Sequence, residues 1–251
     1  MSTRDAVVIV LARGGSKGVP GKNVAMIAGK PCIAWTLECA LAAQRVGHIA
    51  VSSDDERALT IAREMRCDVV QRPAALATDT ARIDDAARHA CEQLRLAGKI
   101  AQPQPIVILY ANVPVRPQGL IDRAIELLVS SGCDSVQSYQ PVGKHHPWWT
   151  ARLDASGQVS AWEGSVLNHG VFRRQDLPPA YIPDGAIIAL TQRALFCEIP
   201  NATVGPHQFF GVDRRGVINS EGSVVDIDAK YDLLVADAML RERHGMGAQH
   251  A

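Results

Sequence analysis

The sequence predicts an α/β protein whose mostly parallel sheet carries helices on both faces. Short apolar runs alternate with longer helical stretches through the first 140 residues, and this alternation is typical of parallel sheets. Polar segments directly follow several apolar runs, as ligand-binding loops do at the carboxyl ends of parallel strands. The alternation breaks after residue 140, where Pro and Trp become frequent.

Five runs are expected to form the strands of the first 140 residues. They cover 6–12, 48–53, 68–71, 105–110 and 134–139. The first, "AVVIVLA", is continuously apolar, as expected for a strand buried on both faces. It is too short to span a membrane.

Four stretches between these runs carry apolar residues at helical spacing. They cover 31–44, 55–65, 80–97 and 119–131. Pro31 suits the first turn of its helix. Asp54 or Asp55 is expected to cap the second helix, and Asp79 the third, because a carboxylate accepts from free backbone N–H groups there.

The chain is expected to contain a core and one inserted sub-region. The core comprises 1–140 and 185–251, and the insertion comprises 141–184, read as short antiparallel strands and loops. The run "AIIALT" at 186–191 resumes the core. The segment from Ser223 to Gly245 is expected to form a strand, a turn and an amphipathic helix.

Charge, hydropathy and cysteine content indicate which partners and which cellular location to expect. Lys and Arg together number 26, as do Asp and Glu, and no long basic run is present, so nucleic acid is not an expected partner. No membrane-length apolar stretch or cleavable leader pattern is visible, so we expect no membrane association and a cytoplasmic location. The six scattered cysteines lack a C-x-x-C pair and are expected to be reduced core thiols.

The segment "LARGGSKGVPGKN" at 11–23 resembles a phosphate-binding loop without matching the Walker pattern. Five residues separate Gly15 from Gly21, and Asn23 stands where that pattern needs Ser or Thr. Glycines nevertheless let backbone N–H groups face an anion. The cations of the loop are Arg13, Lys17 and Lys22. The alternative interpretation is a solvated surface loop.

Two acidic residues near the C-terminus form a second candidate site. Asp226 and Asp228 in "VDID" are two apart, so an extended backbone points both carboxylates to one side. Such a pair repels itself unless a cation lies between, and hard oxygen ligands favour Mg²⁺. The alternative is that Asp228 caps the helix that follows.

A series of motifs along nearly the whole chain resembles one enzyme family. The motifs are "LARGGSKGVPGKN", "AGKPCIAWTLECAL", "VSSDDERALTIARE", "RPAALATDTA", "HHP", "RRQDLP", "PDGAI" and "VDIDAKYDLLVAD". They resemble N-acylneuraminate cytidylyltransferases (CMP-sialic acid synthetases) and related nonulosonic acid nucleotidyltransferases. The resemblance implies a nucleotide-diphosphosugar transferase fold, CTP as co-substrate, Mg²⁺ as cofactor and a homodimer built on 141–184.

The resemblance also assigns roles to individual residues. It implies nucleotide binding by Arg13, Gly14, Ser16, Lys17, Lys22, Asn23, Arg72 and Thr80. It implies sugar binding by Tyr110, Asn112, Arg116, His146, Arg174 and Asp184. It places the metal on Asp226 and Asp228, and the catalytic set is Lys22, Arg13 and Asp228.

Two of these assignments keep a structural alternative. His146 either touches the sugar or only shapes the loop beside Trp148 and Trp149. Arg174 either binds the sugar carboxylate bidentately or is a solvated charge at a dimer interface. Asp232 is interpreted as a supporting acid.

The sequence departs from the family pattern mainly on the sugar side. The departures are Tyr110, Asn112, Trp149, Asp184 and Ile188, and Arg82 replaces a usual Ser beside the nucleotide segment. We therefore expect a ulosonic acid other than N-acetylneuraminate, and Arg82 leaves the choice of base open.

The resulting hypothesis is an enzyme that transfers CMP from CTP to the anomeric hydroxyl of a 2-keto sugar acid and releases pyrophosphate. A neighbouring alternative is a CMP-Kdo or other ulosonic acid nucleotidyltransferase. An alternative of another class is a non-catalytic nucleotide-binding module. The presence of Lys22, Asp226 and Asp228 favours an enzyme.

Overall fold

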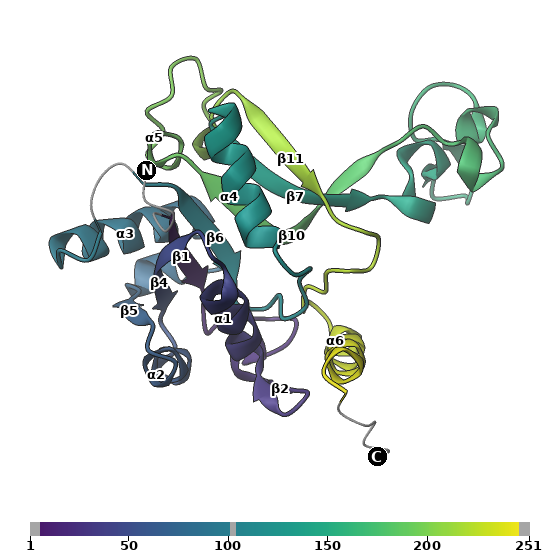
Figure 1. The fold of residues 1–251 in the computed structure, drawn as a ribbon. Coiled ribbons are helices and arrows are strands. Elements are labelled where there is room, and N and C mark those ends of the chain that lie inside the picture. The colour runs from purple at the N-terminus through teal and green to yellow at the C-terminus, as the bar shows by residue number, and fades with distance from the viewer. Residues whose placement is uncertain (1–5, 101–103, 246–251) are drawn as a thin grey trace.

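A seven-stranded sheet forms the centre of the molecule in the computed structural model, which describes residues 6–100 and 104–245 (Figure 1). Its order is β11-β7-β10-β6-β1-β4-β5. β10 is antiparallel to β6 and β7, and the other neighbouring pairs are parallel. The strands are β1 (Ala6–Leu11), β4 (Val46–Ser53), β5 (Asp68–Gln71), β6 (Ile106–Tyr110), β7 (Ser135–Pro141), β10 (Tyr181–Leu190) and β11 (Arg214–Ile218). The expected mostly parallel sheet is confirmed.

Helices cover both faces of this sheet, as predicted. The side chains of β1 alternate between two buried clusters, with Val8 and Val10 in one and Val7 and Ile9 in the other. The first cluster includes residues of α1 (Cys32–Ala42), α2 (Glu56–Glu64) and α4 (Leu120–Ser131). The second includes residues of α3 (Ile83–Leu96) and α5 (Gln192–Leu195).

The last helix, α6 (Lys230–Arg243), packs outside the sheet against a third cluster. Its Ala236 and Leu240 join Trp35 of α1 and Ile27 of the small hairpin formed by β2 (Met26–Ile27) and β3 (Lys30–Pro31). This cluster also contains Ile227. α6 thereby holds the segment 226–228 against the N-terminal part of the chain.

The loops that follow the parallel strands gather at one edge of the sheet. β1, β4, β5 and β6 run parallel and end at Leu11, Ser53, Gln71 and Tyr110. The loop after β1 contains the 3₁₀ turn η1 (Lys22–Val24), and the one after β5 contains η2 (Ala74–Leu76). The predicted crowding of polar residues at this edge is confirmed.

An arm projects from the sheet where β7 and β10 extend beyond their neighbours (Figure 1). Their outer ends pair through Tyr181 with Pro141 and Ile182 with Gln140. The tip carries a hairpin of β8 (Ala151–Leu153) and β9 (Val159–Ala161) and the 3₁₀ turns η3 (Gly143–His145), η4 (Pro147–Trp149), η5 (Leu167–Gly170) and η6 (Arg174–Asp176). The short antiparallel strands expected in 141–184 are present, and β10 begins earlier than predicted.

Helix starts were predicted with mixed success. Asp55 caps α2, because its Oδ1 accepts from the backbone N–H of Arg57 at 3.0 Å. Asp79 does not cap α3, which begins at Ile83; its carboxylate pairs with two cations instead. Pro31 is the residue before α1 rather than part of its first turn.

The C-terminal third differs most from the prediction. The expected strand before α6 is reduced to one bridge between Val225 and Val115. The edge strand β11, "RRGVI", was missed because its charges and glycine indicate a loop; backbone pairing to β7 makes it a strand. A further 3₁₀ turn, η7 (Gln208–Phe210), precedes it.

All six cysteines are free thiols, and four of them are buried in the core, as expected. Burial raises the pKa of Cys32 and of Cys91 to about 12, so these thiols stay protonated at neutral pH. Within the described ranges, none of the helices has both the length and the apolar character that crossing a bilayer requires.

Candidate functional site

The loop after β1 packs tightly against the acidic segment from the other end of the chain. Gly18 lies so close to it that a Cβ at this position would meet the carbonyl oxygen of Asp228 at 2.4 Å. Gly21 adopts a left-handed backbone with φ of 69° just before η1. These two positions require glycine, and they bring Lys22 next to residues 226–228.

Lys22 joins the loop to the acidic segment. Its Nζ donates to the carbonyl oxygen of Ile227 at 2.6 Å and pairs with Asp228 Oδ1 at 2.8 Å. The Lys22 side chain is only 15% exposed. A cation held in this way is positioned before any anionic ligand arrives.

Asn23 and Gly14 complete the inner side of the loop. Asn23 is buried, and its Nδ2 donates to the carbonyl oxygen of Arg13 at 2.8 Å. Its Oδ1 has no hydrogen-bond partner among the described residues, and the residue lines a cavity. The backbone N–H of Gly14 donates to Asp54 Oδ1 at 2.8 Å, so this N–H is already used.

A cavity of about 280 Å³ lies between this loop and the segment after β5. Its lining includes the predicted nucleotide residues Arg13, Ser16, Lys22, Asn23 and Arg72, together with Thr78, Asp79, Arg82, Tyr110 and Asn112. The tertiary structure therefore gathers most of the predicted nucleotide-binding set around one space. Thr78, rather than the predicted Thr80, faces this cavity.

Two arginines shape the far wall of this cavity. Arg72 is buried and donates from Nη2 to the carbonyl oxygen of Ser52 at 2.7 Å and from Nε to its Oγ at 3.1 Å. Burial lowers the pKa of Arg72 to about 10, which keeps it charged at neutral pH. Arg82 pairs with the buried Asp84 at 2.8 Å. This ion pair neutralises the charge of Arg82, which stands where the family pattern usually has Ser, and it connects this wall of the cavity to the start of α3.

The acidic pair has the predicted geometry. Ile227 is fully buried between Asp226 and Asp228, so the two carboxylates lie on the opposite side of the extended segment. Burial, and next the charge of Asp228, raise the pKa of Asp226 to about 6. Asn112 Nδ2 donates to Asp226 Oδ1. Among the described residues, Asp228 pairs with Lys22 at 2.8 Å, whereas the hydrogen bond to Asp226 comes from the neutral amide of Asn112.

The alternative interpretation of Asp228 as a helix cap is wrong. α6 begins at Lys230, and Asp232 Oδ2 accepts from the backbone N–H groups of Asp228 and Ala229 at 2.9 and 2.7 Å. Asp232 thus satisfies the helix start, in agreement with its expected supporting role. The carboxylate of Asp228 is left facing Lys22 and solvent.

A metal ion would find two hard oxygen donors here. Among the residues that the structure describes, no group of three or more His, Cys, Asp or Glu side chains is arranged to hold a metal. Asp226 and Asp228 alone fit Mg²⁺, which is commonly bound through one or two carboxylates plus phosphate oxygens and water.

A second cavity of about 390 Å³ adjoins the first, and Tyr110 lines both. Its other walls are Gln137, Ser138, Gln140, Pro183, Asp184, Gly185, Ile187, Ile188, Val224 and Asp226. Burial raises the pKa of Tyr110 to about 12, so the phenol is a neutral donor at physiological pH. Asp184 accepts from Ser138 Oγ, Asn219 Nδ2 and the backbone N–H of Ala186. Its carboxylate therefore connects three segments of the chain at this wall by hydrogen bonds.

Four predicted sugar-binding residues do not line this second cavity, and one of them, Asn112, lines the first cavity instead. Arg116 is buried and donates to three carbonyl oxygens and to Thr36 Oγ1. His146 is buried in the arm, with Nδ1 accepting from the Trp148 N–H and Nε2 beside the carbonyl oxygen of Pro178. Arg174 is exposed and pairs with Glu221.

Protein groups already contact the ring nitrogens of His146 and surround the guanidinium of Arg116, so the structure does not bring these two residues to the second cavity, and their role in sugar binding stays a prediction. His146 shapes its loop, as the alternative proposed. Trp149, another expected pocket residue, donates from Nε1 to the carbonyl oxygen of Val171 within the arm.

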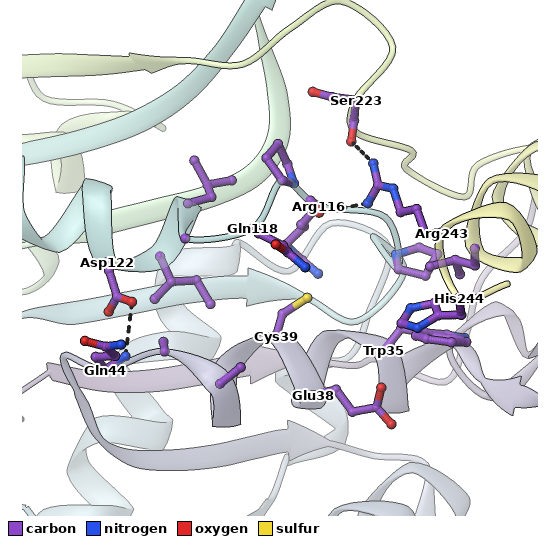
Figure 2. Close-up of a pocket in the computed structure, with 18 residues that line it drawn as sticks. Trp35, Glu38, Cys39, Gln44, Arg116, Gln118, Asp122, Ser223, Arg243 and His244 are labelled. Atoms are coloured by element: carbon purple, nitrogen blue, oxygen red, sulfur yellow. Dashed lines mark hydrogen bonds between the residues drawn. The ribbon is translucent and has the colours of Figure 1, made fainter.

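A third cavity, of about 830 Å³, lies elsewhere, between α1, the start of α4 and the end of α6 (Figure 2). Figure 2 shows His244 over Trp35, with ring centroids 4.9 Å apart. Arg243 donates to the carbonyl oxygens of Arg116 and Ser223 at 3.0 and 3.3 Å. These contacts anchor α6, and this cavity contains neither the loop cations nor the acidic pair.

Together, the fold and the site define an α/β protein in which a cationic loop faces a pair of carboxylates at the carboxyl edge of a parallel sheet. The model of one family, the cytidylyltransferases, matches residues 7–153. The chain belongs to the cytidylyltransferase family.

Named relatives support this membership. The N-acylneuraminate cytidylyltransferase of Streptococcus agalactiae serotype III (strain NEM316) is 34% identical over 186 residues, which are 72% of this chain and 42% of that protein. The chain thus spans less than half the length of this relative. The pseudaminic acid cytidylyltransferase of Campylobacter jejuni serotype O:23/36 (strain 81-176) is 29% identical over 94% of this chain and 96% of its own length.

Solved structures confirm the fold. A CMP:2-keto-3-deoxy-manno-octonic acid synthetase complexed with CTP superposes with a TM-score of 0.67 at 17% identity, covering 95% of this chain and 99% of that chain. A 4-diphosphocytidyl-2C-methyl-D-erythritol synthase gives 0.65 at 16% identity, covering 94% and 98%. The predicted nucleotidyltransferase architecture is therefore correct.

Proposed function

We propose that the protein transfers CMP from CTP to the anomeric hydroxyl of a ulosonic acid and releases pyrophosphate. One observation carries this proposal: the two cavities meet at Tyr110, with Asn112 lining the first and its partner Asp226 lining the second. Lys22 also lines the first cavity, and it pairs with Asp228, two residues beyond Asp226. A phosphate in the first space and a hydroxyl in the second would react between them.

On the nucleotide side, the protein's contribution is positioning and neutralisation of charge. Lys22 is fixed by Ile227 and Asp228, and we assign it to the reacting α-phosphate. Arg13 and Lys17 are assigned to the outer phosphates. Asn23 Oδ1, a buried acceptor without a partner in the described residues, suits a donor group of the nucleotide.

We assign Mg²⁺ to Asp226 and Asp228. When bound, the metal would neutralise charge on the phosphate oxygens and lower the pKa of a bound hydroxyl. Burial, and next the charge of Asp228, raise the pKa of Asp226, and a cation bound between the two carboxylates would favour the ionised form of both.

On the sugar side, we propose a ulosonic acid other than N-acetylneuraminate. The second cavity combines polar Gln137, Ser138 and Gln140 with apolar Ile187 and Ile188. A substrate polar group left without a partner costs about 1–3 kcal/mol, so Ile188 at a usual Tyr position disfavours a sugar that needs that contact. The name of the Campylobacter relative shows that family members act on other nonulosonic acids.

We further propose a homodimer formed through the arm and a cytoplasmic location. The arm exposes large apolar side chains that a monomer would leave in water: Leu153, Trp162, Val166 and Phe172. The six free thiols support a reducing compartment.

Pyrophosphate release is the test of this function. The protein is incubated with Mg²⁺, each of the four ribonucleoside triphosphates and a panel of ulosonic acids. We expect release only with CTP, and a higher kcat/KM for an acid other than N-acetylneuraminate. Fastest turnover of Kdo would favour the neighbouring alternative, and N-acetylneuraminate as the best acid would refute the specificity proposal. Binding of CTP without any release would favour the non-catalytic module.

A further inference from the structure

Asp79 forms ion pairs with two cations of the loop at 11–23, Arg13 and Lys17. Asp79 Oδ1 lies 2.7 Å from Arg13 Nη1, and Asp79 Oδ2 lies 2.6 Å from Lys17 Nζ. Asp79 belongs to the opposite wall of the nucleotide cavity, between η2 and α3. The ion pair between Arg13 and Asp79 therefore joins two residues that line this cavity, and Lys17 contacts the same carboxylate from outside the lining.

This arrangement is not a buried structural network. The Asp79 and Arg13 side chains are 41% and 36% exposed, and Lys17 is more exposed still. Hydrogen bonds from Lys17 and then Arg13 lower the pKa of Asp79, so the carboxylate is charged at neutral pH. Ion pairs of this exposure are weak enough to exchange for another anion.

We propose that Asp79 is a specificity-determining residue that takes the place of the outer phosphates in the free protein and returns to Arg13 and Lys17 as pyrophosphate leaves. This inference rests on the proposed function, in which those two cations bind the β- and γ-phosphates. Asp79 would then weaken pyrophosphate binding and favour release of this product.

The cost of displacing Asp79 should weaken the binding of pyrophosphate but not that of CMP. Pyrophosphate must separate Asp79 from both cations and then lie near a displaced carboxylate, which repels it. CMP has one phosphate, assigned to Lys22, and it leaves the Asp79 pairs intact. Removing the charge of Asp79 should therefore strengthen binding of pyrophosphate without strengthening that of CMP.

The Asp79→Asn substitution tests this inference, because it removes the charge while keeping the shape. Asp213→Asn is the matched control, since Asp213 is an exposed carboxylate paired with Arg215 at 2.7 Å on the edge strand. Titration calorimetry measures pyrophosphate and CMP binding to each folded protein, once with Mg²⁺ and once without it. Asp79→Ser, which also suits a turn, provides a second neutral variant.

We expect Asp79→Asn to bind pyrophosphate about threefold to tenfold more tightly, the range that two exposed ion pairs imply. CMP affinity should stay unchanged, and Asp213→Asn should match the wild type for both ligands. In turnover assays, the inhibition constant of pyrophosphate should fall by the same factor.

Unchanged or weaker pyrophosphate binding in both neutral variants would overturn the inference. The inference would also be overturned if the neutral variants bound pyrophosphate more weakly than wild type only in the presence of Mg²⁺, and that result would instead identify Asp79 as a metal ligand. Calorimetry measures binding without requiring catalytic turnover, so it tests the effect of Asp79 separately from the proposed reaction. Tight pyrophosphate binding by a protein that never releases pyrophosphate from CTP would refute the proposed function and leave the effect of Asp79 on binding intact.

Discussion

Lys22 shows how one side chain links two distant parts of this sequence. It donates to the carbonyl oxygen of Ile227, 205 residues away, and pairs with Asp228. Because the side chain is mostly buried, its loss affects both the free energy of unfolding and the candidate chemistry, and the two effects differ in size.

We predict that Lys22→Ala lowers kcat for pyrophosphate release by roughly 10²–10³, as loss of a positioned charge donor does. The free energy of unfolding should fall by only about 1–3 kcal/mol, from the lost hydrogen bonds to a charged donor. Rate assays and urea unfolding measure the two quantities. Lys230→Ala, an exposed lysine at the start of α6, is the control, and equal activity of wild type and Lys22→Ala would contradict the assignment.

Metal binding and capping of α6 can be tested separately, because Asp226 and Asp228 are the candidate metal ligands whereas Asp232 accepts hydrogen bonds at the start of the helix. We predict that Asp226→Asn and Asp228→Asn remain folded and lose about a thousandfold in rate, which corresponds to about 4 kcal/mol of transition-state stabilisation. High Mg²⁺ should partly restore the rate.

Asp232→Ala is the matched control for these variants. It removes the acceptor for two backbone N–H groups at the start of α6, so it should cost about 1 kcal/mol of stability and leave much of the activity. Full activity of Asp228→Asn would remove this residue from the metal site.

At the scale of single elements, α2 offers a measurable cap. Asp55 accepts from the Arg57 backbone N–H and pairs with its guanidinium at 2.8 Å. We predict that Asp55→Ala lowers the free energy of unfolding by about 1 kcal/mol at pH 7. Asp55→Asn should lose less, because Asn caps a helix as well as Asp and only the ion pair is removed.

The pH dependence of this effect follows from the pKa of Asp55. The side-chain hydrogen bond from Arg57 lowers this pKa below its ordinary value of 3.8. The stabilisation is therefore fully present above the unfolded pKa and disappears as the pH falls through the folded one. Urea unfolding at pH 7 and near pH 3 should show the difference between Asp55→Asn and wild type shrinking, and a constant difference would contradict this account.

At the scale of the whole molecule, the arm determines the expected assembly. Its tip carries Phe172, which is 84% exposed, and other apolar side chains. We predict a dimer at micromolar concentration by light scattering, and dissociation at higher concentration for Phe172→Ser than for wild type. Val204→Ser is the control, because Val204 is equally exposed but lies outside the arm. A monomeric wild type would refute the dimer.

Local patterns were sufficient to predict the sheet, most helices and the cationic loop. β1 is apolar at every position, and the residues after it combine glycine with lysine and arginine. The spacing of Asp226 and Asp228 predicted their common side, because alternation along an extended chain needs no distant partner. The motif resemblance predicted the family and also named five residues that line the first cavity, which are Arg13, Ser16, Lys22, Asn23 and Arg72.

Only the tertiary structure decided how these residues are partnered. No local pattern could place Asp79 on Arg13 and Lys17, assign the cap of α6 to Asp232 rather than Asp228, or bury Arg116 among carbonyl oxygens. The same holds for β11, a polar segment that becomes a strand by pairing with β7. The physical reason is shared: a charge or a backbone group pairs with whatever lies nearest in space, and those neighbours come from elements far apart in the chain.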